Sequence, residues 1–272
     1  MSDKKELFSF SKLDTFDNCQ RNYYYTYIKH IRGGDGIYSF LGTICHTLCD
    51  EIYQNKINNE EAVAMFLESV EEADMLGLEW MSENVKNKYV DCIVHFFKNF
   101  KPYRNDTITI EEYFEVEIEG VILRGYIDLY YILDNVLYVI DFKTSSKFDK
   151  KALEHKRRQL YIYAYALQQK YDYPIKLAFN MLKYYINQRG TLKERSLFGI
   201  TEENKDAYVW VEWNQDAEKD MKNFVRTTID NIEDRIFLDS EEEWELCHPQ
   251  ANSFFCKNLC SHYSLCHEWL RK

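Results

Sequence analysis

Residues 124–144 read Arg-Gly-Tyr-Ile-Asp-Leu-Tyr-Tyr-Ile-Leu-Asp-Asn-Val-Leu-Tyr-Val-Ile-Asp-Phe-Lys-Thr, and this stretch predicts a β-hairpin. Its two arms are rich in Ile, Leu, Val and Tyr, which favour strands. Between them stand Asp134 and Asn135, which can supply the positive φ values that a tight two-residue turn requires. A turn at these two residues fixes the register of the whole hairpin.

That register is expected to bring three charged side chains together. With Leu133 facing Val136, counting outward places Asp128 opposite Asp141, and paired residues point to the same side of a sheet. Lys143 shares the face of Asp141 because side chains alternate along a strand. Opposed carboxylates repel, so a cation is expected between them; oxygen ligands suit Mg²⁺ or Mn²⁺, and a lysine can steady a phosphate or help deprotonate water. The alternative is a solvated strand face, and a slipped register or a bulge would separate the aspartates.

Length and composition favour a single soluble domain. The chain has 272 residues, with only three prolines and nine glycines, and no Ser- or Gly-rich linker, so one domain over residues 1–272 is expected. The 22 tyrosines and the 16% aromatic content argue against disorder. No apolar run reaches the roughly 18 residues of a membrane span, and residues 1–6 do not resemble a signal peptide. We therefore expect a cytoplasmic protein with no membrane partner.

The charge distribution indicates a phosphate-bearing substrate. The net charge is −11, but local distribution matters more than the total. Residues 141–160 hold three acidic and seven basic side chains, the latter being Lys143, Lys147, Lys150, Lys151, Lys156, Arg157 and Arg158. The alternative is an ordinary solvated face at a helix start.

The order of elements predicts an α/β fold with a mixed sheet flanked by helices. A helical layer over residues 36–105 is expected to precede a core over residues 106–213. In that layer His46 and Asp50 share a helix face, although such a histidine is more often a packing residue. Helices are expected at 38–53, 60–76, 82–99, 151–170 and 216–237, and strands at 107–118, in both hairpin arms, and at 175–185 and 207–213.

The helix after the hairpin carries two further candidates. Gln159 and Tyr163 are four residues apart and face the same way, as do Tyr161 and Tyr165. Tyrosines at this spacing are usually core residues. Gln159 is harder to explain by packing, because it lies near the start of this helix and therefore close to the acidic pair of the hairpin.

The C-terminal segment, residues 247–267, predicts a metal-binding site. Cys256, Cys260 and Cys266 lie close together in a stretch that reads as a polar loop, where burial of thiols is not expected. Eight cysteines in a cytoplasmic chain are better explained by metal ligation or buried thiols than by disulfides. Three cysteines are one short of a zinc or iron-sulfur site. The candidates for the fourth ligand are Cys19, Cys247, His262 and His267; three unrelated thiols are the alternative.

In combination these motifs resemble the PD-(D/E)XK nuclease superfamily, in its RecB-like branch. The resemblance rests on His46, on Asp128 in Gly-Tyr-Ile-Asp, on Asp141-Phe142-Lys143, and on Gln159 with Tyr163. The opening Ser-Lys-Leu-Asp-Thr-Phe-Asp-Asn-Cys-Gln-Arg-Asn-Tyr-Tyr-Tyr, residues 11–25, also looks like the start of such domains. That branch includes the nuclease domains of RecB and AddAB helicase-nucleases, CRISPR-associated RecB-like exonucleases and related phage nucleases. The ordered combination, spanning residues 11–266, is far more specific than any of its parts.

The resemblance implies a restriction-endonuclease-like fold and a role for each motif. His46, Asp128, Asp141 and the main-chain carbonyl of Phe142 would bind Mg²⁺ or Mn²⁺, and Lys143 would be the catalytic lysine. Gln159 and Tyr163 would contact the DNA, together with Lys147, Arg157 and Arg158 of the basic segment. In the iron-sulfur members of the branch, one N-terminal and three C-terminal cysteines hold a 4Fe-4S cluster, and the residues that match are Cys19, Cys256, Cys260 and Cys266.

One departure concerns the cysteines. The similar proteins have two residues between the first two C-terminal cysteines, whereas Lys257, Asn258 and Leu259 make three here. Cys247 or a histidine therefore stays open as an alternative ligand, and zinc stays open as the occupant.

The expected function is that of a metal-dependent deoxyribonuclease, with exonuclease action preferred by analogy with the family alone. The chain has no Gly-x-x-x-x-Gly-Lys-Ser/Thr motif, so unwinding would need a helicase or another protein partner. Two alternatives stay open. One is a non-catalytic nuclease-like subunit that binds DNA or acts as a scaffold in repair, recombination or CRISPR adaptation. The other is a zinc-bound interaction domain.

Overall fold

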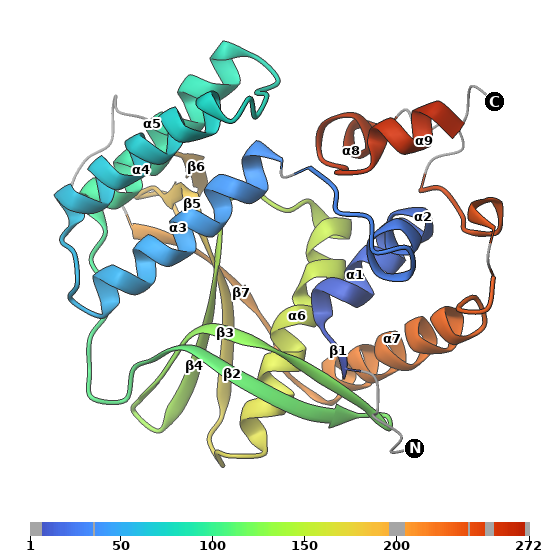
Figure 1. Cartoon of the computed structure of the whole chain (residues 1–272). Helices are drawn as coiled ribbons and strands as arrows, with labels where there is room; N and C mark the ends of the chain where they lie inside the picture. Colours follow the sequence, from blue (N-terminus) through green and yellow to red (C-terminus); the bar gives the residue numbers. More distant parts are fainter. Residues whose placement is uncertain (1–6, 35, 196–204, 239, 248–252, 270–272) are drawn as a thin grey trace. The chain divides into compact units, whose positions relative to one another are not determined.

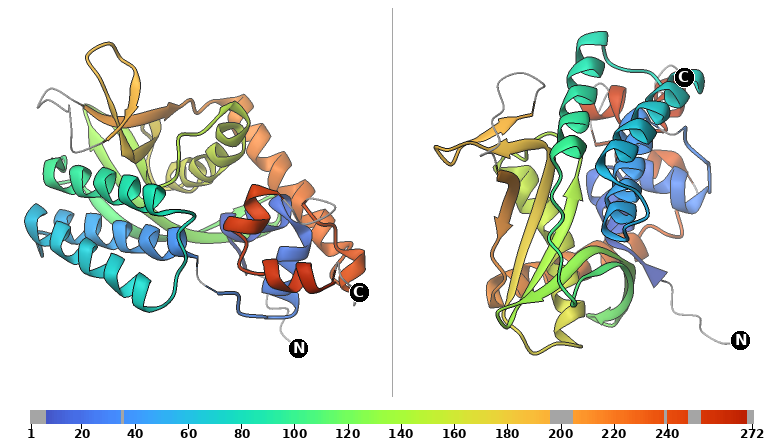
Figure 2. Two further views of the ribbon diagram at one scale, coloured as in Figure 1. Left: turned by 90° about the horizontal axis from the view of Figure 1, so that it is seen from above. Right: turned by 90° about the vertical axis from the view of Figure 1, so that its left-hand side faces the viewer.

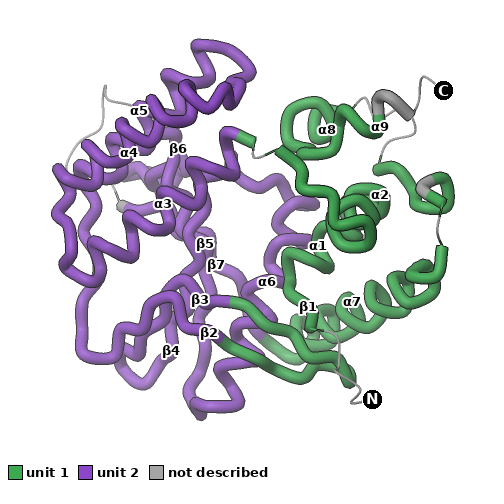
Figure 3. The backbone as a smooth tube through the Cα atoms, in the orientation of Figure 1, with its two compact units in different colours: residues 1–36, 114–125, 214–272 green, residues 37–113, 126–213 purple. Residues whose placement is uncertain are grey.

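A computed structural model describes residues 7–34, 36–195, 205–238, 240–247 and 253–269. These residues form two compact units (Figure 3): unit 1 comprises residues 1–36, 114–125 and 214–272, and unit 2 comprises residues 37–113 and 126–213. Within the described parts, no helix is both long and apolar enough to cross a membrane. The single domain over residues 1–272 stays a prediction, and residues 1–6, where no signal peptide was expected, lie outside the described residues.

The hairpin forms as its sequence predicts. Strands β3 (Val121–Leu133) and β4 (Val136–Lys143) are antiparallel, and their pairing runs from Leu133 opposite Val136 to Leu129 opposite Ile140. Asp134 and Asn135 adopt φ values of 51° and 59°, as a two-residue turn of this kind requires. The predicted turn is therefore confirmed, and the predicted register is confirmed over these five pairs; the pairing of Asp128 with Asp141 stays a prediction.

Further strands extend the hairpin into a mixed sheet. Strand β4 pairs in parallel with β5 (Ile175–Ile186). Strand β5 pairs antiparallel with β6 (Leu192–Glu194) and β7 (Lys205–Val211), and β2 (Thr109–Ile118) pairs with β3. Parallel pairing of β4 with β5 needs a crossover connection, which α6 (Lys150–Gln168) provides. The predicted α/β class with a mixed sheet flanked by helices is confirmed (Figure 1).

Helices cover both faces of the sheet in unit 2. Helices α3 (Ile37–Tyr53), α4 (Asn59–Met75) and α5 (Glu83–Asn99) lie together on one side (Figure 2). They share one apolar core with Ile140 and Phe142 of β4. Helix α6 contacts β4 and β5, and its Gln159 accepts a hydrogen bond from Lys143, which places α6 on the other face. The side chains of β4 therefore alternate between the two helical layers.

Unit 1 contains the first and the last segments that the structure describes. It holds β1 (Leu7–Phe8), α1 (Phe10–Asn18), α2 (Gln20–Tyr23), a π-helix at Tyr24–Ile28, α7 (Gln215–Glu233), a 3₁₀ turn at Glu241–Glu243, α8 (Phe254–Asn258) and α9 (Tyr263–Trp269). Trp244 is fully buried and packs against the rings of Phe16, Tyr23 and Tyr24. The sequence did not predict β1, β6, α8 or α9, because segments this short carry too little periodicity, and α7 ends four residues before the expected position.

Candidate active site

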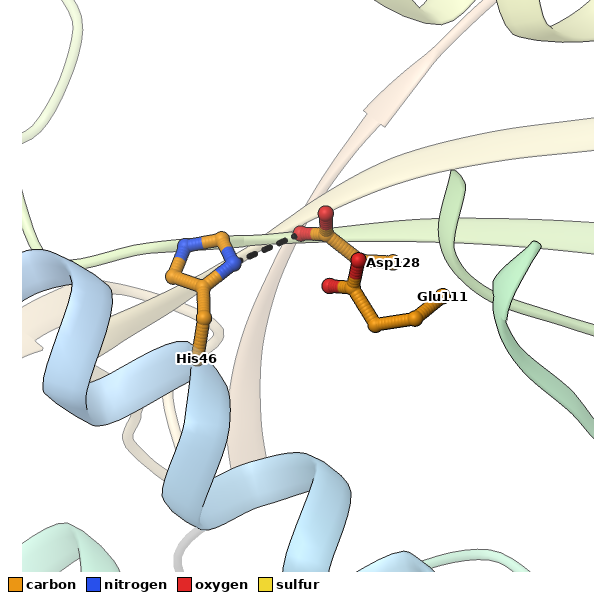
Figure 4. A group of neighbouring side chains, drawn as sticks. All are labelled: His46, Glu111 and Asp128. Carbon is orange, nitrogen blue, oxygen red and sulfur yellow. Dashed lines mark ion pairs between the residues drawn. The ribbon is translucent and has the colours of Figure 1, made fainter. Parts of the chain in front are cut away.

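Three side chains from three elements of unit 2 point toward one another (Figure 4). Helix α3 presents His46, whose Nδ1 lies 3.2 Å from Oδ2 of Asp128 on β3. The same oxygen of Asp128 accepts a hydrogen bond of 2.8 Å from the main-chain N–H of Phe142. Glu111 of β2 completes the group, and one ligand atom from each of the three residues lies within 4.8 Å of the others.

A second set of contacts leads from β4 to helix α6. Nζ of Lys143 lies 2.6 Å from Oδ2 of Asp141 and donates a hydrogen bond of 3.1 Å to Oε1 of Gln159. The amide nitrogen of Gln159 donates in turn to the hydroxyl of Tyr163, at 2.7 Å. The lysine ammonium is thus held between a carboxylate and an amide oxygen.

The donor set fits a divalent cation. Asp141 is fully buried: its Oδ2 is paired with the Lys143 ammonium, and its Oδ1 has no hydrogen-bond partner among the described residues. Oδ1 of Asp50, one helical turn after His46, is buried without a hydrogen-bond partner as well. Buried anionic oxygens without donors are costly. Carboxylates with one imidazole are a ligand set suited to Mg²⁺ and better still to Mn²⁺.

The electrostatics reflect this crowding of acidic groups. Burial raises the pKa of Asp141 to about 6, although the Lys143 ammonium opposes the shift. Burial would lower the pKa of His46, but its hydrogen bond and ion pair with Asp128 outweigh burial and raise that pKa to about 9. The pKa of Asp128 is lowered, because His46, Lys143 and the Phe142 amide outweigh its burial. Negative charge in the site is thus only partly compensated by the protein itself.

Two acidic residues of this site were not predicted as site residues. Glu111 has a φ of 48° inside β2, a conformation that non-glycine residues seldom adopt. In the sequence it is one of several glutamates in a strand, so nothing distinguishes it. Asp50 shares a helix face with His46, which was noticed, but its pKa is raised to about 7 by burial and then by Glu111 and Asp128. Only the folded structure brings those carboxylates near.

The predicted DNA contacts lie on or near helix α6. Lys147 is exposed, and its main-chain N–H donates a hydrogen bond of 3.0 Å to the hydroxyl of Tyr184. Arg157 is half-buried, with its guanidinium 5.7 Å from the ring centre of Tyr161. Arg158 is half-buried too. Gln159 and Tyr163 bond to each other and to Lys143, as described above.

Five cysteines gather in unit 1, and the expectation of a polar loop is wrong. Cys256 and Cys266 are buried and lie on the short helices α8 and α9. Burial, followed by Cys260, Cys19 and other neighbours, raises the pKa of Cys266 to about 12. Cys247, the fifth thiol, lies with its Sγ 3.3 Å from Sγ of Cys256. The polar letters of this segment hid the burial, because helices of five and seven residues show no clear apolar stripe.

His262 and His267 were the two histidine candidates for the fourth metal ligand. Nδ1 of His262 lies 2.8 Å from Oδ1 of Asn22, and its Nε2 lies 3.0 Å from the carbonyl of Ile31. Both ring nitrogens are therefore occupied, and His262 would have to break a hydrogen bond to bind a metal. The side chain of His267 lies outside the described residues.

The site combines a histidine and several carboxylates with a lysine on a mixed sheet. This combination is typical of metal-dependent nucleases. Residues 7–267 match the family model of the PD-(D/E)XK nuclease superfamily, and the chain belongs to that superfamily. The resemblance drawn from the motifs is confirmed.

Part of the chain is also similar to curated proteins. Over 143 residues, 50% of this chain, it is 26% identical to a subunit of the ATP-dependent helicase/nuclease of Streptococcus pyogenes, in serotype M5 (strain Manfredo) and serotype M49 (strain NZ131). The matched part is 12% of the length of those relatives. A crystal structure from Eubacterium rectale, described as that of a candidate exonuclease, has a TM-score of 0.49 at 12% identity and covers 92% of this chain and 87% of that one.

Proposed function

We propose that this chain is a Mg²⁺- or Mn²⁺-dependent deoxyribonuclease that hydrolyses phosphodiester bonds. The observation that carries the proposal is the convergence of His46, Glu111 and Asp128 in a chain of this superfamily, with the buried carboxylate of Asp141 nearby. A structural ion pair alone would leave no reason for so many acidic groups around one histidine.

The residues that would hold the ion are His46, Asp128, Asp141 and the main-chain carbonyl of Phe142, with Glu111 as an added candidate. A bound divalent ion polarises the scissile phosphate and lowers the pKa of its water. His46 must lose its proton before it can bind a metal. The hydrogen bond from the Phe142 amide to Asp128 fixes the rotamer of that carboxylate in advance.

Lys143 is the residue that we assign to the reacting phosphate. Its ammonium would stabilise the charge that develops on the phosphate oxygens or assist removal of a proton from water. Gln159 holds that ammonium, and Tyr163, which is buried, orients the amide of Gln159. In this assignment Tyr163 is a positioning residue, while Gln159 keeps its proposed contact with DNA.

DNA is the proposed substrate, and exonuclease action at DNA ends is preferred. The basic side chains Lys147, Arg157 and Arg158 would contact the phosphate backbone, whose charge dominates the affinity of most DNA-binding proteins. The Streptococcus pyogenes relatives belong to a helicase/nuclease, which supports a helicase as a partner of this chain.

Digestion of end-labelled DNA tests the proposal. Single- and double-stranded substrates are incubated with Mg²⁺, Mn²⁺ or EDTA, and the wild type is compared with Asp128→Asn. The matched control is Asp134→Asn, which removes a carboxylate from the exposed turn of the same hairpin and tolerates the positive φ. We expect metal-dependent cleavage by the wild type and the control, and at least a hundredfold loss in Asp128→Asn.

Covalently closed circular DNA separates the two modes of cleavage. An exonuclease degrades linear DNA and spares the closed circle. Nicking of the circle would show that the chain is an endonuclease. Full activity of Asp128→Asn would refute the site. A wild type that binds DNA and never cleaves it would favour the non-catalytic subunit.

For the thiols we propose a 4Fe-4S cluster held by Cys19, Cys256, Cys260 and Cys266, with zinc as the less favoured occupant. The proposal rests on the resemblance of these four cysteines to the ligand pattern of the iron-sulfur members of the branch and on their common position in unit 1. Anaerobically purified protein should be brown, with absorption near 400 nm (approximate, for iron-thiolate charge transfer) and iron and sulfide in equal amounts. A colourless protein with bound zinc would reject the cluster.

A further inference from the structure

We propose that Cys247 and Cys256 form a thiol pair that a low-molecular-weight disulfide, such as oxidised glutathione, converts into an intrachain disulfide whenever no metal group occupies Cys256. This inference does not depend on the nuclease activity. It gives a role to the fifth thiol, which the four-cysteine cluster leaves without one.

The geometry of the pair carries the proposal. The two sulfurs lie 3.3 Å apart, and a disulfide bond measures about 2.0 Å, so an approach of about 1.3 Å would close it. Cys247 lies in a bend that follows the 3₁₀ turn at Glu241–Glu243, and Cys256 lies within the short helix α8. The hydroxyl of Ser253 donates a hydrogen bond of 3.1 Å to the sulfur of Cys256, which holds that sulfur beside Cys247.

Exposure divides the chemistry between the two thiols. Cys247 is exposed and Cys256 is buried, so a dissolved disulfide reaches Cys247 first. The Cys247 thiolate attacks one sulfur of oxidised glutathione, forms a mixed disulfide and releases one glutathione thiolate. The Cys256 thiolate then attacks Sγ of Cys247, forms the intrachain disulfide and releases the second glutathione. Two protein thiols are oxidised, one glutathione disulfide is reduced to two thiols, and the two thiol protons remain with the products.

Cys19 is the main competitor for the same partner. Cys19 is buried. The pKa of Cys247 is raised by desolvation first, then by Cys256, and to a smaller extent by Cys19. Cys260 lies with its Sγ 3.9 Å from Oδ1 of Asn22. Selectivity for Cys256 over these thiols therefore distinguishes the folded geometry from random pairing, which would favour the short loop between Cys256 and Cys260.

Peptide mapping tests this pairing directly. The full chain is stripped of iron and zinc under anaerobic conditions, metal loss is verified, and oxidised glutathione is added at about pH 8.5, which increases the thiolate fraction of Cys247 although burial and Cys256 raise its pKa. Remaining thiols are alkylated and the protein is digested with trypsin without reduction. Cleavage after Arg235 and Lys257 releases both cysteines in one peptide, residues 236–257, so the disulfide appears as a loss of two hydrogens without alkylation.

We expect residues 236–257 to be the dominant oxidised peptide, and the same peptide to carry alkylated Cys256 in Cys247→Ser. Cys266→Ser is the matched control, because it removes a buried thiol of the same group and should leave the disulfide intact. Predominant links from Cys256 to Cys260, or from Cys19 to Cys247, would overturn the proposal, as would a wild type in which both thiols of the peptide stay alkylated.

Discussion

At the scale of single residues, the position of Lys143 depends on its two partners. The Asp141 carboxylate of β4 pairs with the ammonium, and Gln159 of helix α6 accepts a hydrogen bond from it. Gln159→Ala is expected to lower kcat by about 10- to 100-fold with a smaller change in KM, because the lysine loses its orientation toward the transition state. Lys143→Ala should cost about 1,000-fold or more. Steady-state cleavage of labelled DNA measures both effects.

The control for this pair is Gln168→Ala, an exposed glutamine at the end of the same helix. It should cleave like the wild type. If Gln159→Ala raised KM and left kcat unchanged, Gln159 would act in DNA binding alone.

Asp50 predicts a stability that depends on pH. Burial, Glu111 and Asp128 raise its pKa to about 7 from an ordinary value of 3.8. Between these values the folded state binds the proton more tightly than the unfolded state, so stability falls as pH rises through this window. Asp50→Asn removes the penalty, and we expect the metal-free variant to melt a few degrees above the wild type at about pH 8.

Thermal melts at several pH values check this sign. The difference in Tm should shrink toward about pH 4, where the wild-type carboxyl is protonated as well. Added Mn²⁺ should raise the wild-type Tm at about pH 8, because a cation offsets the same repulsion. A variant that melts below the wild type at every pH would mean that Asp50 has a stabilising partner.

At the scale of elements, the sequence predicted features that depend on neighbouring residues, but not those that depend on contacts between distant segments. The turn at Asp134 and Asn135 acts between neighbours in the sequence, so its positive φ values and the register followed from residue type. Glu111 escaped because its carboxylate gains a meaning only beside His46, 65 positions earlier in the chain by their numbers. Cys256 and Cys266 escaped as buried residues because α8 and α9 are short and derive their burial from tertiary packing.

Close contact between two segments of unit 1 requires glycine at position 33. A Cβ at Gly33 would stand 2.4 Å from Cβ of Ser261 and 3.1 Å from Nε2 of His262. Gly33→Ala is therefore expected to destabilise the contact by about 1–3 kcal/mol through overpacking. Limited proteolysis after Lys257, together with Tm, measures the effect.

Two comparisons show whether the clash is the cause. Gly34→Ala meets no atom within 4 Å and should behave like the wild type. Ser261→Gly removes the nearest atom, so it should restore much of the stability of Gly33→Ala. Equal losses in Gly33→Ala and Gly34→Ala would point to backbone freedom as the cause.

At the scale of the whole molecule, the two kinds of site belong to different compact units. His46, Glu111, Asp128, Asp141 and Lys143 all fall in unit 2, and the five gathered cysteines all fall in unit 1. Each unit has its own buried aromatic residues, such as Phe97 and Trp244. Loss of the thiol site should therefore weaken unit 1 while the carboxylate site keeps its ligands.

Cys19→Ser tests this separation. If the proposed iron-sulfur cluster is present, we expect this variant to lose its absorption and to expose the C-terminal segment to protease, while Mn²⁺ binding, followed by the electron spin resonance of the free ion, changes by less than about threefold. Asp128→Asn should show the reverse pattern, with normal iron content and Mn²⁺ affinity lowered by at least tenfold. Parallel loss of Mn²⁺ affinity in both variants would show that the two units depend on each other for metal binding, because a ligand set formed within one unit has no physical reason to respond to a thiol of the other.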